Sequence, residues 1–265
     1  MSISKGVFIA PTVRSFGYSA KILLRNTLRN PFDPLMSEKK KGIKFTSASF
    51  DELGQRIIDS TIEGVIPFDS YFEVPANKNA AMLMAITEID TDSKNWFEQE
   101  HEILYEHPLT KSRPSVIYDQ LPFRQIDNYA PIILLNHKSY ISKNITAILM
   151  FSNYRGEAMT DLAPQSMDLR FYNCDGRLLK AGSYQFSFNS AICIDVRKEL
   201  NGLVILSDEP EMITVTARGG NSIFAIQTGI INDSTHNMAL EHSLAPTYFV
   251  TQNMSEVRSR ALIFQ

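Results

Sequence analysis

The histidines and acids of the chain form two groups whose residue types could support acid–base or metal chemistry. The first group places His101 and His107 among Glu100, Glu102 and Glu106. On a helix, two ligands share a face when they lie three or four residues apart, and these histidines lie six apart. The spacing therefore does not form a helical metal site, and we interpret the group as a solvated acidic segment.

The second group holds His236 and His242, with Glu241 beside the latter. A histidine next to a carboxylate can act as a general base, and histidines are common metal ligands. If residues 240–243 form a strand, Glu241 and His242 point to opposite faces of it. These three residues carry the catalytic alternative, and the two histidines are weak metal candidates. We predict that the protein has no cofactor and no metal.

A third group could bind a polar ligand such as a glycan. Sugar sites combine aromatic rings, which stack on the apolar face of the sugar, with polar side chains around it. On the predicted strands the candidates for such a site are Arg170, Tyr172, Asn173 and Tyr248.

Charge is unevenly distributed along the chain. Residues 1–44 carry a balance of +7, whereas the other 221 residues carry −10. Lys21, Arg25 and Arg29 recur every fourth residue, which predicts a helix over residues 19–30 with one basic face. Asn30-Pro31 would end this helix, because the residue before proline avoids helical geometry.

The basic run Lys39, Lys40 and Lys41 follows that segment. Together with Lys21, Arg25 and Arg29, these lysines are our candidates for contact with an anionic partner. The alternative is that the basic segment docks on the acidic remainder of the protein or on another subunit. Nucleic acid is a further partner that the charge allows but does not favour.

Two more helices are expected before residue 115, and strands after it. A capping-box pattern from Ser49 to Glu52 predicts a helix that Gly64 would end, and another helix is expected over residues 91–107. Residues 71–75 and 80–88 have the pattern of strands. After residue 115, apolar and polar residues alternate along residues 167–171 and 213–218, which is typical of strands with one buried face.

We therefore predict a mainly β protein, an antiparallel β-sandwich or jelly-roll-like fold with two or three helices in its N-terminal part. The expected organisation is a basic helical arm and linker over residues 1–46, a mixed α/β region over 47–114 that packs on the body, and a β-sandwich over 115–265. No internal repeat is evident in the sequence. Residues 1–6 lack an apolar stretch behind Lys5, and the longest apolar runs are too short for a membrane span, so we expect a cytoplasmic protein without transmembrane segments.

Residues 168–176, 184–196, 223–227 and 237–240 resemble the strand sequence of the small β-sandwich of sensory rhodopsin transducers. The resemblance covers about residues 130–250. It implies a β-sandwich that acts as an oligomeric binding or signalling module without a catalytic site.

Glycine-rich phosphate loops and the Gly-x-Ser-x-Gly nucleophile motif are missing from the sequence. We therefore predict a non-enzymatic β-sandwich that binds a glycan or a partner protein, or that assembles as a homo-oligomer through its N-terminal arm. One alternative is an enzyme with a site on the sandwich that uses His242, Glu241 and His236. Another is a particle-forming jelly-roll subunit whose basic arm contacts nucleic acid or a neighbouring subunit.

Overall fold

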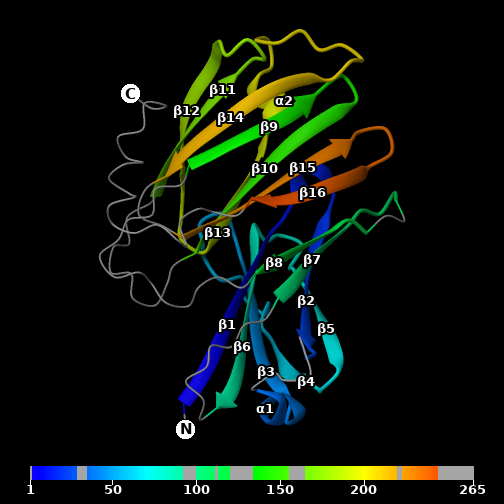
Figure 1. Ribbon diagram of the computed structural model, residues 1–265, viewed down its shortest axis with the longest axis vertical. Coiled ribbons are helices and arrows are strands. Elements are labelled where there is room, and N and C mark those ends of the chain that lie inside the picture. The colour runs from blue at the N-terminus through cyan, green and yellow to red at the C-terminus, as the bar shows by residue number, and fades with distance from the viewer. Residues whose placement is uncertain are drawn as a thin grey trace. The chain divides into compact units, whose positions relative to one another are not determined.

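The computed structural model describes residues 2–28, 35–91, 100–110, 113–119, 134–154, 165–219 and 223–243. The chain divides into two compact units, Met1–Arg124 and Gln125–Gln265, which we call the first and second units. All strand pairs between the named strands are antiparallel, and the described residues form four four-stranded sheets, two in each unit (Figure 1). The prediction of a mainly β, antiparallel β-sandwich protein is therefore confirmed.

The first unit contains strands β1 to β8. Their bounds are β1 Ser2–Pro11, β2 Ser19–Asn26, β3 Ile43–Phe50, β4 Ile62–Ile66, β5 Ser70–Pro75, β6 Met82–Thr91, β7 Glu100–Glu106 and β8 Ser115–Asp119, with the short helices η1 Arg14–Phe16 and α1 Met36–Lys40. One sheet has the order β1-β6-β3-β4 and the other β5-β2-β7-β8. The Tyr105 hydroxyl donates to the Pro11 carbonyl at 3.0 Å, and the rings of Phe45 and Phe72 lie 4.8 Å apart, so the two sheets face each other.

The second unit contains strands β9 to β16. Their bounds are β9 Leu134–Ile141, β10 Ile145–Tyr154, β11 Gln165–Tyr172, β12 Leu178–Phe186, β13 Ser190–Asp195, β14 Glu211–Gly219, β15 Ile223–Asn232 and β16 Asn237–Ser243, with the helix α2 Val196–Glu199. The sheets have the orders β13-β10-β15-β16 and β12-β11-β14-β9. Their shared core includes Leu149, Phe151, Leu169, Phe171 and Val215.

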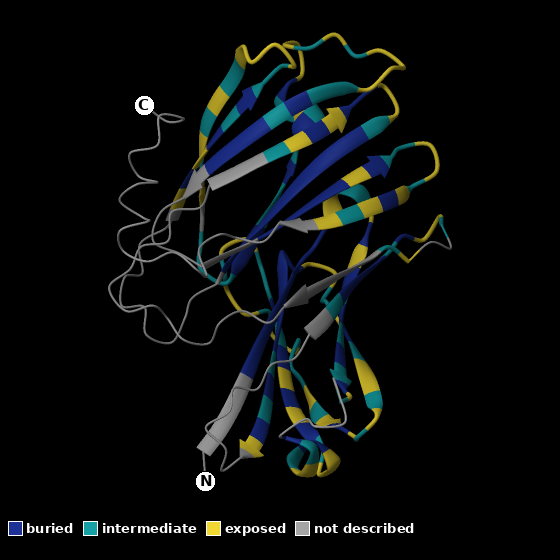
Figure 2. Ribbon diagram, viewed as in Figure 1, coloured by how far each residue is buried: buried dark blue, intermediate teal, exposed yellow. Residues whose placement is uncertain are grey.

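The alternating patterns of the sequence correspond to these buried faces. Met167, Leu169 and Phe171 are fully buried, and Asp168 is exposed. Figure 2 shows buried and exposed segments alternating along several strands. Apolar side chains on one face of each strand are the main source of stability in such a sandwich, because every one leaves water on folding. The strands expected at residues 71–75 and 80–88 are also present, as β5 and β6.

The first unit contains the short helices η1 and α1, but the helix expected over residues 19–30 is wrong where the structure describes it. Residues 19–26 form β2, with Ala20, Ile22 and Leu24 buried and Lys21 and Arg25 on the opposite face. A spacing of four residues is an even number, so it places side chains on one face of a strand as well as of a helix. The spacing of the charged residues therefore did not discriminate between a helix and a strand.

The helix expected from Ser49 is also wrong, because Ser49 lies near the end of β3 and the next residues form turns. The Asp51 carboxylate accepts hydrogen bonds from the backbone N–H groups of Leu53 and Gln55, which closes a turn instead of starting a helix. Of the helix expected at residues 91–107, residues 92–99 lie outside the described residues and residues 100–106 form β7.

The two units share one strand order, although the sequence shows no evident repeat. Counted from its first strand, each unit has the sheets 1-6-3-4 and 5-2-7-8, so β9 corresponds to β1 and β16 to β8. The chain is therefore a tandem repeat of one eight-stranded topology.

The correspondence extends to single residues at one corner of each sandwich. Asn26 of β2 pairs with Ser70 of β5, and Asn153 of β10 pairs with Ser190 of β13. The preceding Asp69 and Asn189 have φ of 57° and 56°, a left-handed conformation that Asp and Asn tolerate better than most residues. The buried amides of Asn26 and Asn153 donate to the carbonyls of Ile66 and Ser187, just before these turns.

Candidate functional site

Three connections of the first unit meet at one end of its sandwich. The connection β1–β2 leads into Ser19, the connection β5–β6 leaves Pro75, and the connection β7–β8 leaves Glu106. Their ends are adjacent because β2 pairs with both β5 and β7, so that Ser19 lies opposite Glu106 and Lys21 opposite Pro75. This end of the unit is where the structure places surface hollows.

Two hollows lie between these connections, and we call them together the loop groove. One, of about 260 Å³, is lined by the β1–β2 and β5–β6 connections and includes Arg14 and Lys78. The other, of about 580 Å³, is lined by the β1–β2 and β7–β8 connections and includes His107 and Arg113. Gly17 and Ser19 line both. The second hollow lies within the range of about 300–1,000 Å³ that is usual for ligand pockets, and the first adjoins it and is smaller.

The wall of the loop groove at Gly17 is closely packed. Gly17 has φ of 82°, and a Cβ atom built on it would lie 2.8 Å from His107 Nε2, so no larger residue fits without movement. The His107 ring is largely buried and packs on Tyr18, with ring centroids 4.9 Å apart. Its Nδ1 accepts the backbone N–H of Leu109 at 3.2 Å, which leaves the proton of the neutral ring on Nε2.

Four charged side chains neutralise one another beside the loop groove. Lys21 lies 3.2 Å from Glu73 and 2.9 Å from Glu106, and Arg113 lies 3.3 Å and 2.6 Å from the same two acids. The hydrogen bond from Lys21 lowers the pKa of Glu106, and the same contact raises the pKa of Lys21. Each of the two acids is thus paired with both cations.

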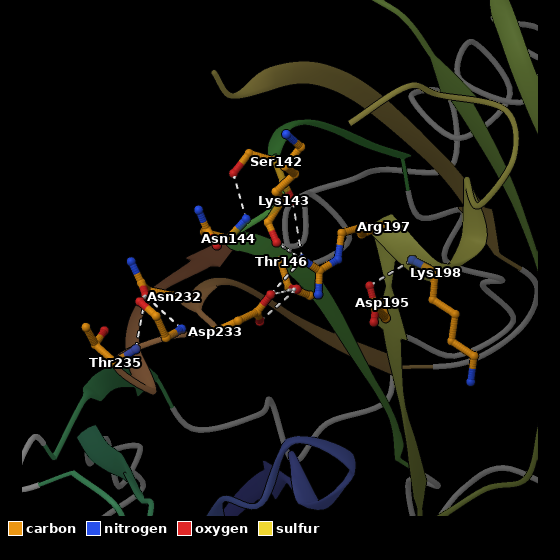
Figure 3. Close-up of polar contacts among 11 residues, drawn as sticks. Ser142, Lys143, Asn144, Thr146, Asp195, Arg197, Lys198, Asn232, Asp233 and Thr235 are labelled. Atoms are coloured by element: carbon orange, nitrogen blue, oxygen red, sulfur yellow. Dashed lines mark hydrogen bonds and ion pairs between the residues drawn. The ribbon is translucent and has the colours of Figure 1, made fainter. Parts of the chain in front are cut away.

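The second unit has a polar cluster at the corresponding end (Figure 3). Arg197 of α2 donates to the carbonyls of Ser142 and Lys143, at 3.3 and 3.0 Å, and forms an ion pair with Asp233 at 2.6 Å. The Thr146 hydroxyl donates to the same carboxylate, at 3.1 and 3.3 Å from its two oxygens. Arg197 therefore joins the β9–β10, β13–β14 and β15–β16 connections.

Replacing Asp233 with asparagine should lower the free energy of unfolding of the second unit by about 1–2 kcal/mol. The ion pair is partly buried, and the change leaves the Arg197 guanidinium with carbonyl acceptors alone. Asp208→Asn is the matched control, because Asp208 lies 3.8 Å from Lys143 in an exposed pair that should contribute less than about 0.5 kcal/mol. Chemical denaturation measures both, and equal losses would contradict the assignment of Arg197 as the joining residue.

The glycan candidates lie partly together. Arg170 and Tyr172 share the outward face of β11, since the alternate residues Leu169 and Phe171 are in the core. Asn173 lies in the turn after β11, where its side-chain oxygen accepts the backbone N–H of Arg177 at 2.8 Å. Tyr248 lies outside the described residues. The ligand-binding role of these residues stays a prediction.

The histidine candidates lie at different places in the β15–β16 hairpin. Glu241 and His242 are consecutive in β16 and pair with Thr228 and Gln227. His236 lies in the β15–β16 turn with φ of 54°. The charge of Glu241 acts on His137 of β9. Burial lowers the pKa of His137, and the Glu241 carboxylate raises it to a lesser extent. Sequence reasoning missed His137 because β9 and β16 are distant in the chain.

The candidates for an anionic partner are dispersed. Besides Lys21, Arg25 is in an ion pair, with Glu102 of β7. Lys39 is buried, with its ammonium 3.2 Å from the Thr27 carbonyl, whereas Lys40 and Lys41 are exposed. Arg29 lies outside the described residues. Lys21 and Arg25 therefore fit the alternative in which basic residues near the N-terminus pair with the protein's own acids.

Within the described residues, no three His, Cys, Asp or Glu side chains gather as metal ligands, and no helix is long and apolar enough to cross a membrane.

Comparisons with known proteins give little support for a family. No family model and no curated protein matches the chain. Among solved structures, a β-glucuronidase from glycoside hydrolase family 2 matches with a TM-score of 0.18 and 10% identity, over 90% of this chain and 23% of that one. Bacteroides uniformis β-glucuronidase 2 matches with a TM-score of 0.19 and 8% identity, over 90% and 26%. The chain thus spans about a quarter of the length of these structures, and such low similarity supports no functional inference.

Proposed function

We propose that the protein is a non-enzymatic β-sandwich binding protein, and that a small polar ligand, glycans included, binds in the loop groove. The observation that carries the proposal is the pair of adjoining hollows lined by Arg14, Ser19, Lys78, His107 and Arg113. Pockets that bind small molecules combine such volume with a few convergent polar groups on a rigid frame. The frame here is formed by the ends of β2, β5 and β7, which are paired in one sheet.

The packing at Gly17 fixes one wall of the loop groove. Loops usually tolerate substitution, yet here the backbone approaches the His107 ring so closely that a side chain at position 17 would displace the ring.

The resemblance to the sensory rhodopsin transducers, which implies a binding module, concerns residues 130–250 and stays a separate proposal about the second unit. The catalytic alternative, which uses His242, Glu241 and His236, is less favoured, because His236 lies in the turn before β16 and His242 lies six residues further along the chain.

Ser19→Trp should abolish ligand binding, because Ser19 is exposed and lines both hollows. The assay is the thermal midpoint of the full chain in the presence of a panel of mono- and disaccharides and N-acetylated amino acids. A ligand that binds the folded state raises this midpoint. The control is Ser183→Trp, which places the same ring at an exposed position of β12.

We expect at least one compound to stabilise the parent and Ser183→Trp but not Ser19→Trp. If Ser19→Trp responds as the parent does, the loop groove is not the site. If no compound stabilises the parent, the small-ligand proposal is wrong, and a partner protein takes its place.

A further inference from the structure

The repeat gives the loop groove an internal counterpart. Asn26 corresponds to Asn153 by strand pairing, and Ser19 and Thr146 each lie seven residues before these asparagines on the corresponding strands β2 and β10. Lys78 lies in the β5–β6 connection, and Arg197 lies in the corresponding β13–β14 connection. Each unit therefore has a hydroxyl and a cation at the same two places of its topology.

The two units differ in the third group, the carboxylate. In the second unit the β15–β16 turn supplies Asp233, which binds both the Thr146 hydroxyl and Arg197 (Figure 3). In the first unit the corresponding β7–β8 connection, residues 107–114, reads His-Pro-Leu-Thr-Lys-Ser-Arg-Pro and contains no acid. Ser19 lines both hollows, and among the described residues its hydroxyl makes one long contact, of 3.4 Å, to the Glu106 carbonyl.

Among the described residues around the loop groove, one cation has no counterion. Lys21 and Arg113 balance Glu73 and Glu106, and Arg14 is paired with Glu52 while it also donates to the Asn79 carbonyl at 2.8 Å. Lys78 is exposed and has no counterion among the described residues. A ligand with one negative charge would complete this balance, and charge-assisted hydrogen bonds are about twice as strong as neutral ones.

We infer that the loop groove takes the carboxylate of an acidic small ligand, which Ser19 and Lys78 bind as Thr146 and Arg197 bind Asp233. The inference rests on the proposed function and adds the ligand class to it. The carboxylate could belong to an acidic sugar or to an acidic amino-acid side chain, because both present the same group to a hydroxyl and an ammonium.

The test uses two pairs of probes that differ in the carboxylate alone or nearly so: galacturonate with galactose, and the α-amide of N-acetylglutamate with the α-amide of N-acetylglutamine, so that the second member of each pair is uncharged. Calorimetric titration of the full chain gives the dissociation constants. We expect the acid of at least one pair to bind about tenfold or more tightly than its neutral match, because a hydrogen-bonded charge pair is lost in the match. The pair that shows the difference identifies the source of the carboxylate.

Variants separate this inference from the proposed function. Lys78→Gln and Ser19→Ala should each weaken the acid about tenfold and leave the neutral match unchanged, whereas Ser19→Thr should retain binding, as in the second unit. Lys40→Gln, at an exposed lysine of α1, is the control. If neither acid binds more tightly than its match, or if Lys78→Gln has no effect, the inference is wrong. The proposed function would still stand if Ser19→Trp abolished binding of the neutral probes.

Discussion

Val215→Asp should unfold the second unit. The Val215 side chain is fully buried in the core that joins its two sheets, among side chains that include Leu169 and Phe171. A carboxylate there finds no partner, and we expect a loss of about 4 kcal/mol or more, which is a large part of the stability of a domain this size. Chemical denaturation followed by circular dichroism measures the effect.

Thr214→Asp is the matched control for this prediction. Thr214 precedes Val215 in β14 and points to the other face, where it lies between Tyr172 and Lys138 of the neighbouring strands. We expect a loss below about 1 kcal/mol there. Similar losses at both positions would mean that the face of β14 has been assigned incorrectly.

Deleting residues 1–44 should unfold the first unit and leave the second folded. The deletion removes β1, which pairs with β6, and β2, which lies between β5 and β7 in the other sheet. Val7, Phe8, Ile22 and Leu24 are fully buried, so their removal exposes the core of this unit. Hydrogen exchange resolves the two units in one experiment.

The same deletion tests the expectation of a basic assembly arm. If the truncated chain keeps both units folded and changes only its oligomeric state, residues 1–44 act as an assembly element and the placement of β2 is wrong. Deleting residues 250–265 instead gives a truncation that removes no described strand.

The sequence predicted the second unit better than the first, for a physical reason. In residues 167–171 and 213–217 polar and apolar residues alternate strictly, and only a strand buries every second side chain. In β2 the apolar Leu23 interrupts the alternation, and the four-residue spacing of Lys21 and Arg25 fits both periods. The local pattern was therefore compatible with two structures, and strand pairing decided between them.

The loop groove could not be predicted because Ser19, Lys78 and His107 come from three connections that are far apart in sequence. The repeat did leave a readable signal. Phe-Asp-Ser at residues 68–70 and Phe-Asn-Ser at 188–190 mark the same turn in both units. Three residues are too few to recognise as a repeat without the pairing that places them.

Because both units have the same strand order, a strand of one unit could be inserted into a sheet of the other during folding. The side chains on the face of β2 and β10 that points away from the core between the two sheets oppose this exchange. Lys21 and Arg25 of β2 correspond to Ile148 and Ser152 of β10, and both of these β10 residues are fully buried. If β2 took the place of β10, Lys21 and Arg25 would be buried without the carboxylates of Glu73, Glu106 and Glu102, with which they form ion pairs. Each incorrect insertion of β2 thus carries a desolvation cost of several kcal/mol, so the sequence difference between the repeats keeps each strand in its own sandwich.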